Sequence, residues 1–155
     1  MNVEICEERA DSADAQQLIT ELDEVLGSQY PVESRHGYSV EKLLNQGVIF
    51  YVVRCDGAAA ACGGVQFFNL EYGELKRMYV RPGFRGMGLA RRMISEIEGL
   101  ARGRGVNLLR LETGIHQVDA IHLYESCGFT RIGPFGAYFE DPLSRCYEKQ
   151  LVLSK

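Results

Sequence analysis

The spacing of hydrophobic positions predicts two helices in the first third of the chain. Apolar residues recur every three or four positions over residues 12–27, which is the period of one helix face, and Asp11 or Ser12 can serve as the N-cap. Because glycine commonly ends a helix, we expect this one to end at Gly27. The same signals predict a shorter helix over residues 39–47.

The period then changes to that of β-strands. Residues 48–55 are almost continuously apolar, as expected of a strand buried on both faces, and Asp56-Gly57 is typical of a two-residue hairpin turn. These features predict an antiparallel meander. Further strands are predicted over residues 3–6, 58–68, 74–80, 107–113 and 145–153.

A long amphipathic helix connects two of these strands. Its apolar positions, which begin at Leu89, repeat on one face between strands 74–80 and 107–113. A strand, helix and strand in this order form a right-handed crossover, so the two strands should be parallel neighbours. A last helix is predicted to end at Gly128, and the whole pattern indicates one mixed α/β sheet in a single domain.

Composition narrows the possible functions. The chain has 155 residues, 46% of them hydrophobic, which suits one core. Its 17 basic and 21 acidic residues give a net charge of −4, which argues against a general nucleic-acid binder. Five cysteines without a C-x-x-C pair favour neither a disulfide framework nor a zinc site. With no signal-like start or long apolar run, we expect a cytoplasmic protein with no metal and no membrane contact.

The stretch FRGMGLARRM, residues 84–93, places two glycines between arginines where the long helix begins. The first N–H groups of a helix lack acceptors and carry partial positive charge, so bare backbone there binds anions such as phosphate. A dinucleotide fingerprint would need glycine at Arg91, and a P-loop would need lysine and a hydroxyl residue at Leu89 and Ala90. Two interpretations remain: a phosphate loop without a metal-binding hydroxyl, and a glycine turn that caps an ordinary helix.

The segments LKRMYVRPGFRGMGLARRM, LLRLET and AIHLYESCGF, in this order, resemble the GNAT superfamily of acyl-CoA-dependent N-acyltransferases. Residues 85–90 match its Q/R-x-x-G-x-G/A motif, and residues 117–129 match N-x-x-A-x-x-L-Y-x-x-x-G-F except that Gln117 replaces the asparagine. The resemblance implies one N-acetyltransferase domain over residues 1–155. It also implies a mixed, mostly antiparallel sheet of six or seven strands, with about four helices on both faces and strands splayed at the cofactor site.

The resemblance implies acetyl-CoA as the co-substrate. Backbone N–H groups of residues 85–90 would cradle its pyrophosphate, and the strand end at residues 78–80 would pair with its peptide-like arm. The N–H of Val80 would then polarise the thioester carbonyl. The implied cofactor-binding residues are Met78, Tyr79, Val80, Arg85, Gly86, Met87, Gly88, Leu89, Ala90, Gln117 and Tyr124.

Two residues are candidates for the chemistry. Tyr124 occupies the family position for protonating the coenzyme A sulfur, although its helix face would also suit a core residue. Glu74 shares a strand face with Met78 and Val80 and is the expected base, acting through water. An ion pair with a lysine or arginine is the alternative for Glu74, and Glu112 and Glu71 are reserves.

The acceptor residues are expected in two loops that flank the acceptor cleft in this family. Arg35 and His36, beside Tyr38, could hold an anionic group, and Tyr138 could form an aromatic wall. The expected reaction is direct transfer of acetyl through a ternary complex to a primary amine of a small molecule or peptide. The alternative is a non-catalytic acyl-CoA-binding or regulatory domain, and small domains of this kind are often homodimers.

Overall fold

A computed structural model describes residues 1–152 of the protein. The strands are β1 (Val3–Glu7), β2 (Ile49–Cys55), β3 (Ala58–Phe68), β4 (Tyr72–Val80), β5 (Leu108–Gly114), β6 (Thr130–Ile132) and β7 (Ser144–Gln150). The helices are α1 (Ala13–Gln29), α2 (Val40–Asn45), α3 (Leu89–Gly103) and α4 (Val118–Ser126), with short 3-10 turns at Val32–Ser34 and Pro82–Phe84. The last predicted strand extended to residue 153, which lies outside the described residues.

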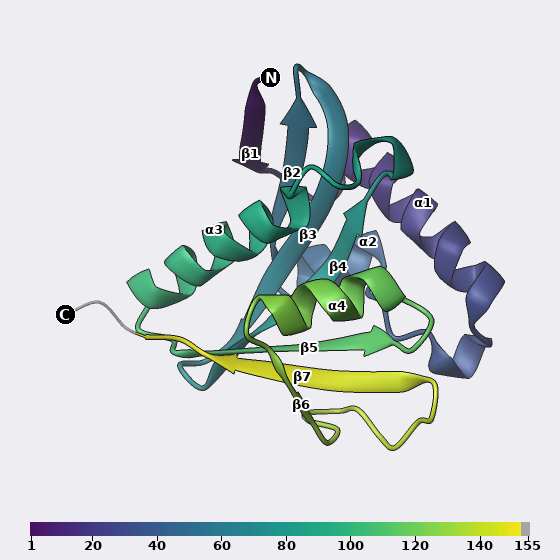
Figure 1. The fold of residues 1–155 in the computed structure, drawn as a ribbon, viewed down its shortest axis with the longest axis vertical. Coiled ribbons are helices and arrows are strands. Elements are labelled where there is room, and N and C mark those ends of the chain that lie inside the picture. The colour runs from purple at the N-terminus through teal and green to yellow at the C-terminus, as the bar shows by residue number, and fades with distance from the viewer. Residues whose placement is uncertain (153–155) are drawn as a thin grey trace.

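The strands form one mixed sheet in the order β1-β2-β3-β4-β5-β7-β6. Every neighbouring pair is antiparallel except β4 and β5, which are parallel because α3 crosses between them. Apolar side chains of α3 and α4 pack on one face of the sheet, and those of α1 and α2 pack on the other (Figure 1). This arrangement confirms the predicted fold class, including the parallel neighbours on either side of the long helix.

The two parallel strands separate soon after they meet. Their register contains only the pairs Gly73 with Leu109 and Glu74 with Arg110. On its other edge β4 stays paired with β3 as far as Val80. One edge of β4 is therefore open from residue 75 to residue 80, which is the splay that the resemblance implies.

A bulge bends β4 within this open stretch. The register with β3 shifts between Cys62 and Gly64, and Arg77 has a φ of 55°, which is unusual for a residue other than glycine. The thiol of Cys62 donates to the Arg77 carbonyl over 3.4 Å. The bulge places both Lys76 and Arg77 on the side of the sheet that α1 covers, where Lys76 meets Tyr38 and Arg77 meets α1.

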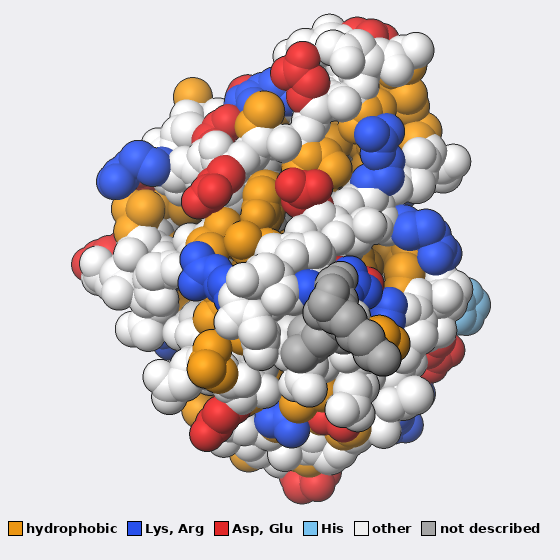
Figure 2. Space-filling view, turned by 90° about the vertical axis from the view of Figure 1, so that its left-hand side faces the viewer, with side chains coloured by type: hydrophobic (Ala, Val, Ile, Leu, Met, Phe, Trp, Pro, Cys, Tyr) orange, Lys and Arg blue, Asp and Glu red, His pale blue; other side chains and the backbone are white. Residues whose placement is uncertain are grey.

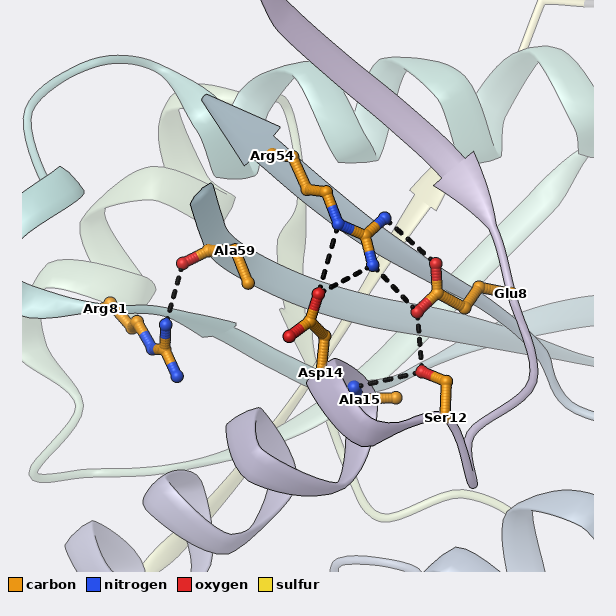
Figure 3. Close-up of polar contacts among 7 residues, drawn as sticks. All are labelled: Glu8, Ser12, Asp14, Ala15, Arg54, Ala59 and Arg81. Atoms are coloured by element: carbon orange, nitrogen blue, oxygen red, sulfur yellow. Dashed lines mark hydrogen bonds and ion pairs between the residues drawn. The ribbon is translucent and has the colours of Figure 1, made fainter. Parts of the chain in front are cut away.

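A cluster of polar side chains fixes the start of α1 against the sheet (Figure 3). Arg54 on β2 donates to both carboxylate oxygens of Glu8 at 3.0 Å and to Asp14 at 2.8 and 3.2 Å. The Ser12 hydroxyl donates to Glu8 over 2.5 Å and accepts from the Ala15 N–H over 3.1 Å. Ser12 is therefore the N-cap, and the first turn of α1 is tied to β2.

Two sequence expectations differ from the structure. The first helix does not end at Gly27 but continues to Gln29, because Tyr30 precedes Pro31 and takes the extended conformation that proline favours in its neighbour. The strand β6 was not predicted separately, since its three residues are too few and too exposed to show a period. The hairpin at Asp56-Gly57 is confirmed by φ values of 50° and 85° at the two turn residues.

Charge is mixed on the face of the molecule drawn in Figure 2, where acidic and basic side chains alternate with apolar ones. Within residues 1–152, no helix combines the length and apolar character needed to cross a membrane.

Candidate active site

A cavity of about 900 Å³ opens where β4 and β5 separate. The start of α3, one face of α4 and the loop after α1 complete its wall. Its volume is that of a site for a large ligand. Most residues expected from the sequence line it: Arg35, His36, Tyr38, Met78, Tyr79, Val80, Arg85, Gly86, Gly88, Leu89, Ala90, Gln117, Tyr124 and Tyr138. Met87 and Glu74 lie outside the wall.

The start of α3 presents bare backbone to this cavity. Gly88 is its N-cap, with a φ of 75° and no side chain to satisfy the first N–H groups of the helix. The first turn contains no acidic residue. A Cβ added at Gly88 would meet no atom within 4 Å, so open space lies in front of these amides. The arrangement suits a phosphate group.

The arginines around this loop divide into two groups. Arg85 and Arg91 line the cavity, and Arg91 also donates to the Ser126 hydroxyl over 2.7 Å. Arg81, by contrast, bonds the Ala59 carbonyl over 2.9 Å, as Figure 3 shows, and pairs with Glu21 over 2.8 Å. Arg81 therefore stabilises the junction with α1 and adds no free charge to the site.

The end of β4 directs a backbone amide into the open edge. The Arg81 N–H donates to the Ala60 carbonyl of β3 over 2.9 Å. Because successive N–H groups along a strand point to opposite edges, the Val80 N–H points away from β3 and toward the splay. The Val80 carbonyl, on the same edge, accepts from Arg85 Nε over 3.2 Å. The Val80 amide is thus placed as a donor for a ligand oxygen.

Tyr124 belongs to both the core and the cavity wall. It packs in the cluster formed by α3, α4 and the sheet, with its ring centre 5.9 Å from that of Phe129. Burial raises the pKa of its hydroxyl well above the ordinary value of 10, so the group stays protonated at neutral pH. The hydroxyl is therefore available as a hydrogen-bond donor to a ligand atom in the cavity.

Glu74 is enclosed by its neighbours. It is 3% exposed, and its Oε2 accepts from Lys76 Nζ over 2.8 Å and from the Tyr138 hydroxyl over 2.5 Å. This geometry corresponds to the ion-pair alternative, with the lysine two residues away on the same strand. Burial and the adjacent carboxylate raise the pKa of Tyr138, so its hydroxyl remains a donor.

A second carboxylate does reach the cavity. Glu112 on β5 is half-buried, lines the wall, and accepts from the Ser144 hydroxyl over 2.6 Å. Burial raises the pKa of Glu112 above its usual value of 4.5, which makes the carboxylate a stronger base. It sits on the strand that faces the open edge of β4.

His36 connects the two loops in which the acceptor residues are predicted, because it contacts residues of the loop before β7. Its Nε2 lies 3.6 Å from Asp141 Oδ2, and its ring meets those of Tyr138 and Phe139 edge-on at 5.5 and 5.6 Å between centres. Arg35, one residue earlier, donates from Nε to a carbonyl of the same loop over 2.9 Å. The predicted acceptor residues are therefore brought together at one end of the cavity.

Sequence reasoning assigned no role to Lys76, Arg77 or Tyr30. All three line the cavity. Strand alternation placed Lys76 beside Glu74 but could not show that the two form a pair. Tyr30 donates to Gln117 Oε1 over 2.8 Å across a separation of 87 residues, for which the sequence holds no signal.

No group of three or more His, Cys, Asp or Glu side chains in residues 1–152 is arranged to hold a metal ion. The Acetyltransferase (GNAT) family matches residues 15–129 of the chain. The chain belongs to this family. The match spans the cavity's main elements, from α1 to the end of α4, and the protein is accordingly an N-acetyltransferase.

Relatives of this GNAT N-acetyltransferase agree with the family. An "IAA acetyltransferase" from Azospirillum brasilense is 44% identical over 136 residues, which are 87% of this chain and 89% of that protein. A Klebsiella pneumoniae structure described as an acyl-CoA N-acyltransferase is 33% identical, with a TM-score of 0.82 and coverage of 97% and 98%. The PaiA N-acetyltransferase of Thermoplasma acidophilum, solved with coenzyme A, shares the fold at 20% identity, a TM-score of 0.75 and coverage of 97% and 99%.

Proposed function

We propose that the protein transfers acetyl from acetyl-CoA directly to a primary amine of a small molecule or peptide. The observation that carries this proposal is one continuous cavity that joins the bare start of α3, the open edge of β4 and the acceptor loops. A cavity that reaches all three elements can hold both substrates at once. Transfer through a ternary complex then needs no covalent enzyme intermediate.

Two parts of the cavity wall suit coenzyme A. The amides that start α3 suit the pyrophosphate, and the unpaired edge of β4 suits the amide groups of the pantetheine arm. The Thermoplasma acidophilum N-acetyltransferase, which has the same fold, was solved with coenzyme A, and this supports coenzyme A as the ligand. When bound, acetyl-CoA supplies the thioester whose acyl group is transferred.

Three groups of the protein divide the work of aminolysis. The Val80 N–H stabilises the charge that develops on the carbonyl oxygen, a contribution of about 10²–10³ in rate for donors of this kind. A carboxylate takes one proton from the attacking amine. The Tyr124 hydroxyl gives a proton to the departing sulfur, so that the C–N bond forms and the C–S bond breaks without leaving a free thiolate.

We assign the base to Glu112. Strand alternation in the sequence had favoured Glu74 instead. The reason is access, since Glu112 lines the cavity whereas Glu74 is held by Lys76 and Tyr138 outside the wall. The raised pKa of Glu112 also suits a group that must accept a proton near neutral pH. The role of Glu74 as base stays a prediction, and the pH profiles of Glu112→Gln and Glu74→Gln distinguish the two carboxylates.

The test is thiol release from acetyl-CoA across a panel of amines, together with calorimetric measurement of coenzyme A binding. IAA is assayed beside the amine panel, because one relative is named an IAA acetyltransferase. We expect Tyr124→Phe and Glu112→Gln each to lower kcat by about 10²–10⁴ while coenzyme A still binds. Tyr147→Phe, a buried tyrosine outside the cavity wall, is the control and keeps wild-type turnover.

Two results would contradict the proposal. Tight coenzyme A binding without turnover of any amine would favour the non-catalytic binding domain. Accumulation of an acetylated enzyme in the absence of an amine would replace direct transfer with a covalent mechanism.

A further inference from the structure

A buried lysine forms part of the wall at the acceptor end of the cavity, between residues 31–38 and 133–143. Lys76 is 6% exposed, and its ammonium lies 3.9 Å from the centre of the Tyr38 ring and 5.9 Å from that of Tyr138. All three residues line the cavity. Aromatic faces beside an ammonium stabilise its charge, so the site is built to keep a cation here.

Glu74 is the counter-ion of this lysine, and it does not line the cavity. Glu74 accepts from Lys76 over 2.8 Å and is itself fixed by the Tyr138 hydroxyl over 2.5 Å. Lys76 lines the cavity and Glu74 does not, so a ligand meets the cation and not its partner. The bond to Glu74 uses one of the three ammonium donors. Lys76 is therefore oriented and charged, with donors left for a ligand.

Two arginines also line this cavity. Arg35 donates from Nε to the Tyr30 carbonyl over 2.9 Å, and it forms no ion pair within the described part of the chain. Arg77 pairs with Asp23, but its Nε is buried without a hydrogen-bond partner among residues 1–152. A Cβ at Gly37 would lie 1.7 Å from Arg77 Nη1, so the loop passes close over this guanidinium.

The cations of this wall differ in their partners. Lys76 and Arg77 each have a carboxylate partner, whereas Arg35 has no ion-pair partner within residues 1–152. Ammonium and guanidinium groups both donate hydrogen bonds to the oxygens of a carboxylate. The carboxylate of Glu112 lines the same cavity and suits the amine of the acceptor.

We propose that the acceptor is an amine that also carries a carboxylate, and that Lys76 and Arg35 bind this carboxylate. Glu74 and Tyr138 are positioning residues, because they act through Lys76. Apolar residues of α1 in the same wall, Leu22, Val25 and Leu26, provide contacts for an apolar body between the two charged ends. This inference rests on the proposed function and names the class of its acceptor.

The experiment compares matched acceptors in the thiol-release assay. A series of aminocarboxylates with linear or aromatic bodies is paired with the corresponding primary amides and aminophosphonates. We expect kcat/KM to be about 10- to 100-fold higher for the best carboxylate than for its amide, the effect of one charge-assisted contact in a buried site. The preference should appear in KM more than in kcat.

Variants of Lys76 then test whether this residue causes the preference for a carboxylate. Lys76→Met should lower the carboxylate-to-amide ratio of kcat/KM by about tenfold or more, and Lys76→Arg should restore part of it. Because Lys76→Met leaves Glu74 buried and unpaired, the double change Lys76→Met with Glu74→Gln removes both charges and guards against misfolding. Lys42→Met is the matched control, since Lys42 lies 4.4 Å from the same Tyr38 ring but outside the cavity wall.

The outcomes separate this inference from the proposed function. Equal turnover of amines and aminocarboxylates, or an unchanged ratio in the folded double variant, would overturn the carboxylate site and leave the acetyltransferase proposal standing. A preference for aminophosphonates would overturn the assignment to a carboxylate. Coenzyme A binding with no amine acetylated would overturn both. A carboxylate preference that falls in Lys76→Met and persists in Lys42→Met supports the inference.

Discussion

The hydroxyl of Tyr30 donates a hydrogen bond to Gln117 Oε1 over 2.8 Å, which links the end of α1 to the start of α4. The same oxygen accepts from the His116 N–H over 2.9 Å. Gly114 makes room for the ring, because a Cβ there would lie 2.1 Å from the hydroxyl. Gln117, which replaces the asparagine usual in the family, is thus oriented by the residue that caps the end of α1.

Removing the Tyr30 hydroxyl should therefore weaken cofactor binding. Tyr30→Phe keeps the ring but frees Gln117, and we expect KM for acetyl-CoA to rise by about 3- to 10-fold with little change in kcat. Tyr147→Phe is the control, because it also loses one hydrogen bond, to Glu125, in a buried place away from the cavity. Equal KM values for the two variants would show that Gln117 does not contribute through Tyr30.

Gly88 should be essential for coenzyme A binding. A methyl group at this position enters the open space in front of the α3 amides, so Gly88→Ala should raise the Kd for coenzyme A tenfold or more. The φ of 75° also strains any side chain, at about 1–2 kcal/mol, so stability should fall as well.

Gly83→Ala is the matched control for that measurement. It has no positive φ, and a Cβ there meets no atom within 4 Å. Binding by calorimetry and unfolding by denaturant should be measured on both variants. A folded Gly88→Ala protein with wild-type affinity would refute the placement of the pyrophosphate.

The pH dependence of turnover should identify the base. Burial raises the pKa of Glu112 above 4.5, so kcat/KM should rise as pH increases through this raised value and the carboxylate loses its proton. Glu112→Gln should lose this limb, leaving only the rise that follows the acceptor amine. Glu74→Gln should keep the limb and alter the carboxylate preference instead. The reverse pattern would assign the base to Glu74.

The cluster around Arg54 should contribute to stability. Its hydrogen bonds lower the pKa of Glu8, so this group stabilises the fold above its ordinary pKa of 4.5 and the contribution is lost as pH falls through the lower folded value. Arg54→Met should cost about 2 kcal/mol near pH 7 and remove that pH dependence. Denaturant unfolding across pH measures both. Arg9→Met, in an exposed pair with Asp11, should change nothing measurable.

Local patterns in the sequence predicted the backbone frame of the site. The crossover around α3 and the glycine spacing before it follow from period and turn chemistry, which depend on neighbouring residues. Contacts between segments that are distant in the chain produce no such local pattern in the sequence. His36 contacts Asp141, and Tyr138 contacts Glu74 on β4. Both contacts depend on how loops fold back onto segments more than sixty residues away in the chain. Strand alternation placed Glu74 on the same face as Met78 and Val80, and this expectation was wrong. The bulge at Arg77 turns Met78 and Val80 toward α3, whereas Glu74 lies on the other face. There its neighbours Lys76 and Tyr138 enclose it.

In the proposed complex, acetyl-CoA pairs with the edge of β4 that is open between residues 75 and 80. A ligand that binds only the native chain adds RT ln(1 + [L]/Kd) to its stability, or about 2.7 kcal/mol at a hundredfold excess over Kd. The melting temperature should rise with the logarithm of coenzyme A concentration. The acyl-CoA supply of the cell would then also govern how long the enzyme survives proteolysis.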